Sequence, residues 1–344
     1  MKKKAITWAF VGLGRQAERF AEAMSKTQGQ RLVAIVGDSK TRTAGFAKRY
    51  KVSHRFSSLK VLLTSDKKKH LIDAVYIASP NNMHARESLQ AIRAGKDVLC
   101  EKPLALSIRE GENIVREAKK GRVHFLVDFQ LRQNPAIQEA RKMIAQEKLG
   151  VLVYMDMHWS IGTLGQSALP KLPTHMQWRE DLKRSGGGAV MARGVHLFDL
   201  VRFLIGQEIT AVRSFTDASA HSVDRTAVGI LELEKGTPAL ITTSKQIPSA
   251  DNRIVIYGSK GKLTLGIFDG GAHTLEFTTA RGTRKTKFYA RDLYGKVLQD
   301  FANAREKKAF VGATADDGKA VIAITEAFIA SAKKARAVSV SFRN

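Results

Sequence analysis

Residues 6–17 read ITWAFVGLGRQA, and this stretch decides the fold of the chain. Ile6–Val11 is a short apolar run typical of a buried strand, and apolar side chains recur at helical spacing after it. The residues between fit G-x-G-x-x-G/A: Gly12 permits a tight turn, Gly14 lets the backbone approach a pyrophosphate, and Ala17 keeps helix and strand close. The stretch therefore predicts a strand–turn–helix unit that binds a dinucleotide, with two further candidate contacts at the helix start, Arg15 and Gln16.

The alternation of strand and helix continues to about residue 129. Short apolar runs are expected to form strands at Leu32–Val36, Ala74–Ala78, Val98–Cys100 and Val123–Phe129. Helices are expected between them over Arg42–Tyr50, Leu59–Leu63 and His84–Ala94, and in the segment opened by the capping box Ser107–Glu110. Strands that alternate with helices predict an α/β domain with a doubly wound parallel sheet, buried on both faces, over residues 1–128.

The pattern changes after this domain. Closely spaced strands follow one another from Val151–Trp159 to Thr274–Thr279, joined by hairpin turns such as Gly258–Gly261. This spacing is typical of an antiparallel sheet. Helices are expected over Ala136–Glu147, Ala189–Ile205, Tyr294–Arg305 and Ala315–Lys333. The sequence therefore predicts a second domain, of the α+β class, over residues 129–344.

The composition limits the class of protein. The 344 residues are 44% hydrophobic and 26% charged, which is enough to bury two full-sized cores. The single cysteine, Cys100, excludes a disulfide scaffold and a Cys-based zinc site. No apolar stretch approaches the roughly 20 residues of a membrane span, and the N-terminal lysines and apolar run are not closed by the cleavage site of an export signal. We expect a cytoplasmic protein with no membrane partner.

The chain is strongly basic. It carries 57 Lys and Arg against 32 Asp and Glu, a net charge of +25 that is spread over both predicted domains. Such a surplus favours polyanionic or phosphorylated partners, or a solvated basic surface. The longest basic runs, Lys2–Lys4 and Lys67–Lys69, are not interleaved with aromatic side chains on which bases would stack. We therefore expect no nucleic-acid partner.

The adenosine end of the predicted dinucleotide site departs from the usual pattern. An acidic residue at the tip of the second strand would bind the ribose 2′-hydroxyl, but Gly37 occupies that tip and Asp38 follows one position later. Ser39, Lys40 and Arg42 then supply donors and positive charge, as a 2′-phosphate requires. We expect NADP in preference to NAD. The alternative is that Asp38 caps the next helix and the basic side chains are solvated.

Two further motifs follow predicted strands, at the carboxyl ends where open α/β sheets bind ligands. They are ASPNNMH at Ala78–His84 and CEKP at Cys100–Pro103. With GLGR at residues 12–15 and SGGGAVMARGVHLFDL at residues 185–200, the chain resembles the glucose–fructose oxidoreductase/inositol dehydrogenase (Gfo/Idh/MocA) family over nearly its whole length. The resemblance implies an N-terminal Rossmann domain and a C-terminal domain whose large open, mainly antiparallel sheet builds homodimers or homotetramers.

The resemblance also implies an activity. Family members mostly oxidise or reduce sugars, polyols and related hydroxy compounds with NAD or NADP. Lys102 matches the family's catalytic lysine, whose ammonium stabilises alkoxide character on the reacting oxygen, and Pro103 fixes the lysine's backbone. His196 matches the histidine that exchanges the substrate proton near neutral pH. The remaining positions expected to contact the cofactor are Ser79, Pro80, Asn82, His84, Glu101, Gln130 and Lys102 itself.

One position departs from the family pattern. The family usually has an aspartate four residues before the histidine, where the two side chains share a helix face, and this chain has Ala192 there. Arg193 follows, so a negative charge is missing and a positive one is added. The change favours a carboxylated or phosphorylated substrate, or weakened chemistry. In a purely structural interpretation, Arg193 pairs with a neighbouring acid. Two further candidate substrate contacts are Arg132 and Arg179.

Three functions are compatible with these residues. The first is an NAD(P)-dependent oxidoreductase that acts on a hydroxyl or carbonyl group of a sugar, polyol or sugar-acid-like substrate. The second, suggested by Ala192, is a cofactor-binding sensor or regulatory protein with little or no turnover. The third is redox-neutral chemistry through transient oxidation, with a tightly retained cofactor. No metal site is expected, because His158 and His175 are widely spaced and lack supporting carboxylates.

Overall fold

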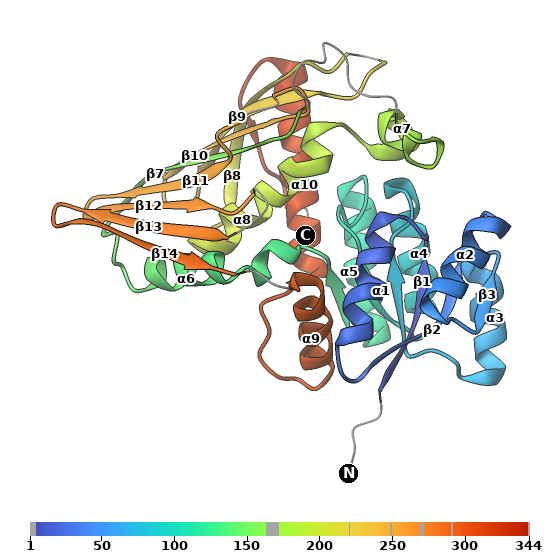
Figure 1. Ribbon diagram of the computed structural model, residues 1–344. Coiled ribbons are helices and arrows are strands. Elements are labelled where there is room, and N and C mark those ends of the chain that lie inside the picture. Colours follow the sequence, from blue (N-terminus) through green and yellow to red (C-terminus); the bar gives the residue numbers. More distant parts are fainter. Residues whose placement is uncertain are drawn as a thin grey trace. The chain divides into compact units, whose positions relative to one another are not determined.

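The computed structural model describes residues 5–162, 172–219, 221–247, 250–268, 272–289 and 292–342. The chain forms two compact units (Figure 1). Unit 1 comprises Met1–Gln130 and Asp292–Lys319, and unit 2 comprises Leu131–Arg291 and Ala320–Asn344.

A seven-stranded sheet forms the centre of unit 1. Its strand order is β15-β6-β5-β4-β1-β2-β3, and every pair is parallel except β15 with β6. The predicted doubly wound parallel sheet is thus confirmed. Because β1 pairs with β2 on one side and β4 on the other, the strand order reverses there, and such a switch point leaves room for a ligand at the carboxyl ends. The strands are β1 Ile6–Val11, β2 Gln30–Val36, β3 His54–Phe56, β4 Ala74–Ile77, β5 Asp97–Cys100, β6 Phe125–Val127 and β15 Ala313–Thr314.

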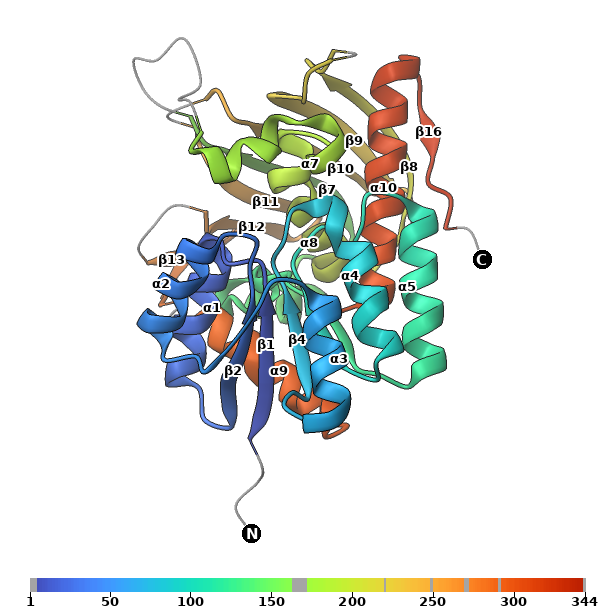
Figure 2. The same cartoon turned by 90° about the vertical axis from the view of Figure 1, so that its right-hand side faces the viewer.

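Helices cover both faces of this sheet (Figure 2). On one face α1 packs against α9, and on the other α4 packs against α3 and α5. The expected capping box is present: Ser107 Oγ accepts from the backbone N–H of Glu110, and the Glu110 carboxylate accepts from that of Ser107. The helices are α1 Arg15–Lys26, α2 Lys40–Tyr50, α3 Leu59–Lys69, α4 Asn81–Arg93, α5 Ile108–Gly121 and α9 Leu293–Arg305.

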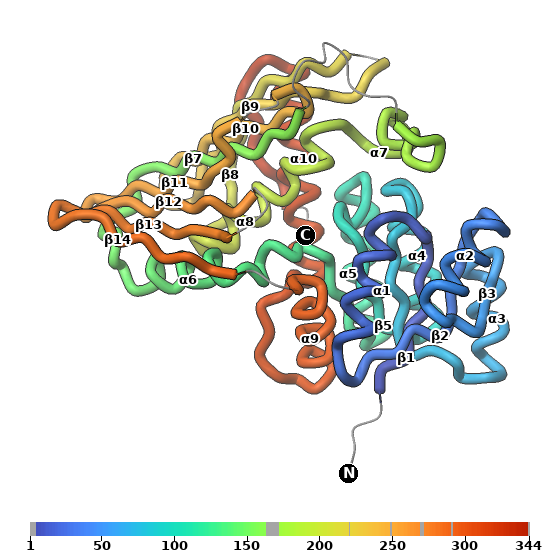
Figure 3. The backbone as a smooth tube through the Cα atoms, viewed as in Figure 1, coloured from blue at the N-terminus to red at the C-terminus, as the bar shows by residue number. Residues whose placement is uncertain are grey.

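Helix α9 joins unit 1 from the far end of the chain, and its red-orange tube lies beside the blue tube of α1 (Figure 3). The ring of Trp8 on β1 lies 4.5 Å from that of Phe301, and Arg19 donates to the Tyr294 hydroxyl at 3.0 Å. Residues 292–319 therefore belong to unit 1, whereas the expected division into 1–128 and 129–344 assigns them to the second domain. Contacts between such distant residues leave no mark on local periodicity.

A nine-stranded sheet forms the centre of unit 2, in the order β14-β13-β12-β11-β7-β10-β9-β8-β16. All pairs are antiparallel except β7 with β10, so the predicted large, mainly antiparallel sheet is confirmed. The strands are β7 Leu152–Ser160, β8 Ile209–Thr216, β9 Thr226–Leu233, β10 Pro238–Ser244, β11 Arg253–Gly258, β12 Gly261–Gly266, β13 His273–Thr279, β14 Gly282–Phe288 and β16 Val338–Ser339.

Helices cover one face of the second sheet and leave the other exposed. Helix α6, Pro135–Ala145, packs on β12 to β14 and on α8, Val195–Ile205, and Phe328 of α10, Ala315–Lys334, fills the space that a side chain at Gly229 of β9 would need. On β8 and β9 side chains alternate between buried and exposed. The exposed set includes two large apolar residues, Phe215 at 64% and Ile230 at 51%.

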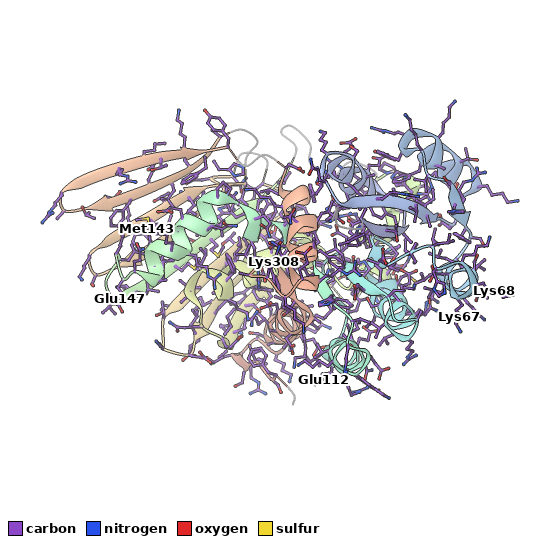
Figure 4. All side chains as sticks on the ribbon, turned by 90° about the horizontal axis from the view of Figure 1, so that it is seen from below. Lys67, Lys68, Glu112, Met143, Glu147 and Lys308 are labelled. Atoms are coloured by element: carbon purple, nitrogen blue, oxygen red, sulfur yellow. The ribbon has the colours of Figure 1, made fainter. Side chains whose placement is uncertain are left out.

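The longest basic run within the described residues lies on a helix end. Lys67, Lys68 and Lys69 form the last turn of α3, and the side chains of Lys67 and Lys68 project from its surface (Figure 4). Cations are favoured there by the helix dipole, so this run is accounted for without a partner. Within the described ranges, no helix is long and apolar enough to cross a membrane.

Candidate active site

The glycine loop between β1 and α1 has the geometry that a pyrophosphate site needs. Gly12 has a φ of +83°, and a Cβ atom there would lie 2.6 Å from the backbone oxygen of Ala78 and the backbone nitrogen of Ser79. At Gly14 the opposite holds, because a Cβ atom would meet nothing within 4 Å. Gly14 is also the N-cap of α1, and no side chain caps the helix there. These features fit a bound anionic pyrophosphate.

At the adenosine end, Asp38 does not cap the helix that follows β2, as one interpretation of the sequence expected. Ser39, not Asp38, caps α2: its Oγ accepts from the backbone N–H of Arg42 at 3.4 Å. Asp38 instead accepts from Arg42 Nη2 at 2.7 Å, and the two side chains are 88% and 45% exposed. An ion pair this exposed stabilises the fold by at most about 1 kcal/mol, so a ligand phosphate can replace it. Lys40 is exposed beside them.

His84 ties together the two loops that follow β4 and β5. It is buried, and its ring nitrogens lie 2.7 Å from the Pro103 carbonyl oxygen and 2.9 Å from that of Ser79. Burial lowers the pKa of His84, and a neutral ring donates to only one of the two carbonyls. Ser79 donates in addition to Glu87 at 2.5 Å. The His84 contacts join the Pro103 carbonyl to the loop after β4. The peptide bond between Lys102 and Pro103 is cis.

Two other expected residues of this region lie at its edge. Pro80 is the N-cap of α4, and Asn82 lies in the first turn of that helix with an exposed side chain, whereas the neighbouring Asn81 is buried. Gln130 begins a short 3₁₀ turn, Gln130–Gln133, and is half-buried.

A buried carboxyl pair lies next to Lys102, and the sequence analysis found only one of its members. Glu101 Oε1 accepts from the Tyr76 hydroxyl at 2.8 Å and from Gln16 Nε2 at 3.4 Å. Asp128 is fully buried beside it, and no N–H or O–H group of the described residues donates to either Asp128 oxygen. Burial and the Glu101 charge raise the pKa of Asp128 well above its usual range. The protonated form of Asp128 is therefore favoured in the folded protein. A lone acid at the end of an apolar strand, Val123–Phe129, is the signal that could have revealed it.

In unit 2, an aspartate shapes the glycine-rich segment before His196. The carboxylate of Asp224 accepts from the backbone N–H of Gly188 at 2.6 Å and of Val190 at 2.7 Å. A Cβ atom at Gly188 would overlap the Asp224 carbonyl oxygen, so only glycine fits. A π-helical turn, Val190–Gly194, then leads into α8, and such turns are frequent at functional sites. Sequence analysis did not single out Asp224.

His196 lies in the first turn of α8, where it is buried. Its ring centroid is 5.6 Å from that of Trp159 on β7, and Trp159 stacks on Phe268 at 4.6 Å. Lys102 belongs to unit 1 and His196 to unit 2.

The three candidate substrate arginines differ in their surroundings. Arg132 is buried against Asp199, to which Nε and Nη2 donate at 2.9 and 2.6 Å. This ion pair engages the guanidinium inside unit 2. Arg193 lies 6.0 Å above the Trp159 ring, and its Nη1 is buried without a hydrogen-bond partner among the described residues. Arg179 is exposed and lies 5.0 Å above the Trp178 ring.

The histidines of unit 2 show no metal-binding arrangement. His158 Nε2 lies 2.8 Å from Ser160 Oγ, and His175 is exposed. In the parts of the chain that the structure describes, no three His, Cys, Asp or Glu side chains gather as metal ligands.

Sequence comparisons relate the chain to known proteins over nearly its whole length. Residues 6–129 match the model of an oxidoreductase family with an NAD-binding Rossmann fold, GFO/IDH/MocA, and residues 137–264 match the GFO/IDH/MocA C-terminal domain. Similar proteins include the 1,5-anhydro-D-fructose reductase of Ensifer adhaerens, 25% identical over 97% of this chain and 98% of that protein. The inositol 2-dehydrogenase of Rhizobium meliloti (strain 1021) is 27% identical over 98% and 99% of the two chains.

Solved structures agree with this fold. Levoglucosan dehydrogenase, in complex with NADH and levoglucosan, has a TM-score of 0.86 at 21% identity, over 99% of this chain and 100% of that one. The two family models together span most of the chain, with the Rossmann model on unit 1 and the C-terminal model on the second sheet. The chain belongs to the Gfo/Idh/MocA oxidoreductase family, with its NAD-binding Rossmann fold.

Proposed function

We propose that the protein is an NAD(P)-dependent oxidoreductase that acts on a CH–OH or carbonyl group of a sugar, polyol or sugar-acid-like substrate. The observation that carries the proposal is the Gly12–Gly14 loop, which opens the N-terminus of α1 at the switch point of a parallel sheet. The similarity of the whole chain to a reductase of an anhydro sugar and to dehydrogenases of inositol supports the substrate class.

The residues of the proposed function have distinct chemical roles. A bound nicotinamide supplies the hydride acceptor or donor. Lys102 follows β5 at the carboxyl edge of the sheet, where its ammonium binds the reacting oxygen and stabilises negative charge on it. A ring nitrogen of His196 accepts the hydroxyl proton during oxidation and returns it during reduction. The Gly12–Gly14 loop and the first turn of α1 bind the pyrophosphate.

The roles of Lys102 and His196 are tested by alanine substitution. Lys102→Ala should abolish turnover and leave cofactor affinity within a few-fold, since its charge acts on the reacting oxygen. His196→Ala should slow turnover by about 10²–10⁴, as expected for loss of a general acid–base group. Lys68→Ala and His221→Ala, at exposed positions, serve as controls and should leave turnover unchanged. Turnover is followed at the nicotinamide absorbance with a panel of sugars and polyols.

Two results would contradict this assignment. Unchanged turnover in Lys102→Ala would remove the lysine from the reaction, and a loss below about threefold in His196→Ala would make that histidine structural. Retained cofactor with no turnover on any substrate would instead favour a sensor.

We further propose a preference for NADP. Arg42 is held only by the exposed pair with Asp38, and Ser39 and Lys40 add donors beside it. A 2′-phosphate recruits Arg42 bidentately, whereas the ribose of NAD would need Asp38. Arg42→Ala should therefore weaken NADP binding and leave NAD binding nearly unchanged, as measured by direct titration. Tighter binding of NAD by the unaltered protein would identify Asp38 as the ribose ligand.

We propose that the open face of the second sheet forms a homodimer or homotetramer contact. Phe215 and Ile230 are exposed on neighbouring strands there, and large apolar patches mark interaction sites. Phe215→Asp should lower the molar mass measured by light scattering, whereas Phe310→Asp, at an exposed phenylalanine of unit 1, should not. An unaltered mass for the sheet variant would exclude this face.

We also propose a cytoplasmic location. The only cysteine, Cys100, is buried, and burial raises the pKa of its thiol, so an inert reduced cysteine suits a reducing compartment. Cell fractionation with an antibody tests it.

A further inference from the structure

Arg193 is a half-buried cation of unit 2. Among the described residues, its buried Nη1 has no hydrogen-bond partner and no carboxylate lies within ion-pair distance of the guanidinium. Burial and the neighbouring charge of Arg179 lower the pKa of Arg193 to about 10. Proteins pair buried arginines with acids almost without exception, as this chain does with Arg132 and Asp199. Arg193 therefore either destabilises the fold or binds an anionic ligand.

The surroundings of Arg193 place it with the proposed proton-exchanging residue. Arg193 lies 6.0 Å and His196 5.6 Å from the centroid of the same Trp159 ring. The indole face makes a cation–π contact with the guanidinium but accepts no conventional hydrogen bond from its N–H donors. Arg179 adds a second positive charge nearby. At the neighbouring position, Ala192 brings no carboxylate that would compete with an incoming anion.

From this geometry we propose that Arg193 binds an oxyanion of the substrate, so that the substrate is an acidic sugar bearing a carboxylate or a phosphate group. The proposal rests on the proposed oxidoreductase function for its substrate but not for its anion site. A planar guanidinium with free donors binds carboxylate and phosphate oxygens bidentately, and a partly buried site strengthens the bond. The basic surface of the protein, with a net charge of +25, draws an anion toward the site.

The kinetic test compares substrates that differ only in charge. The unaltered protein, Arg193→Gln and Arg193→Lys are assayed with glucose, glucuronate and glucose 6-phosphate, with either cofactor. We expect kcat/KM to favour one of the two anions. Arg193→Gln should raise KM for that anion at least tenfold and change KM for glucose by less than twofold, and Arg193→Lys should recover part of the loss. Which anion responds distinguishes a carboxylate site from a phosphate site.

The control variant is Arg281→Gln, which removes one positive charge at an exposed hairpin and should leave both KM values unchanged. It separates direct binding from long-range attraction. Equal KM changes for charged and neutral substrates in Arg193→Gln, or best activity on glucose, would overturn the proposal.

A second measurement does not depend on turnover. Glucuronate or inorganic phosphate alone should raise the melting temperature of the unaltered protein and of Arg281→Gln but not of Arg193→Met, because a ligand stabilises only the state that binds it. Without any anion, Arg193→Met should melt at the same temperature as the unaltered protein or higher, since it removes an uncompensated buried charge. A lower melting temperature for Arg193→Met would show that Arg193 is structural. If no substrate turns over but the anion shift depends on Arg193, the anion site stands and the oxidoreductase proposal fails.

Discussion

Replacing Asp128 by asparagine should stabilise the protein, and the gain should grow with pH. Asp128 is 0% exposed and lies beside the Glu101 carboxyl, and burial and that neighbour raise its pKa well above the usual range. In the unfolded chain the same carboxyl has a pKa of about 3.9. Below that pH both states hold the proton and the shift has no effect. Above it the unfolded chain releases the proton while the folded one retains it.

The magnitude follows from this linkage. The folded state loses about 1.4 kcal/mol of stability for each pH unit between the unfolded and the folded pKa of Asp128. The asparagine of the variant has no such loss, and its amide can donate an N–H to the neighbouring Glu101 carboxyl. The free energy of unfolding of Asp128→Asn should therefore exceed that of the unaltered protein by an amount that rises with pH, by about 1.4 kcal/mol per pH unit, until the pH reaches the folded pKa of Asp128. Each such unit is a sizeable part of the roughly 5–15 kcal/mol typical of a folded protein.

Urea unfolding at pH 5, 6, 7 and 8, followed by far-UV circular dichroism, measures this difference. The control is Asp66→Asn, which removes another buried carboxylate, one that Lys96 pairs at 2.5 Å. It should destabilise at every pH, because it leaves the lysine without its partner. A constant difference between Asp128→Asn and the unaltered protein, or a lower stability of the variant at pH 8, would refute the raised pKa of Asp128.

Three further perturbations test the fold around the site. Arg132→Ala should cost about 3–5 kcal/mol in urea unfolding because it removes the guanidinium that compensates the buried Asp199 carboxylate. A double variant, Arg132→Met with Asp199→Leu, should recover most of that loss. Gly12→Ala should weaken NADPH binding at least tenfold in a fluorescence titration, because the added methyl would clash with the backbone of Ala78 and Ser79. The control is Gly29→Ala, which is also at positive φ but in open space. It should lower the free energy of unfolding by only about 1 kcal/mol and leave NADPH affinity unchanged. Gly188→Ala, where the added methyl would overlap a backbone carbonyl, should fail to give a cooperative thermal transition, while an unchanged transition would show that the loop can shift.

Much of unit 1 could be predicted because its signals are local. The glycines of residues 12–14 have the conformations that the motif requires, and the capping box at Ser107 and Glu110 is present. The short β3, His54–Phe56, was missed, since three residues are too few to show a period. The strand expected at Val123–Phe129 is confined to Phe125–Val127.

The sequence by itself determined the two sheet types, the dinucleotide loop and the positions of Lys102 and His196 in their motifs. The sheet types and the loop follow from neighbours in the chain, through turn geometry, helix spacing and strand alternation. Lys102 and His196 were identified by the resemblance of their motifs to those of the family. Only the tertiary structure decided which charges are compensated. Asp128 lies beside another carboxyl, that of Glu101, and Arg132 forms an ion pair with Asp199. Arg193 makes a cation–π contact with the Trp159 indole. It also decided that α9 returns to the first sheet. The physical reason is that burial and pairing depend on residues brought together from distant parts of the chain, and these energies have no period in the sequence.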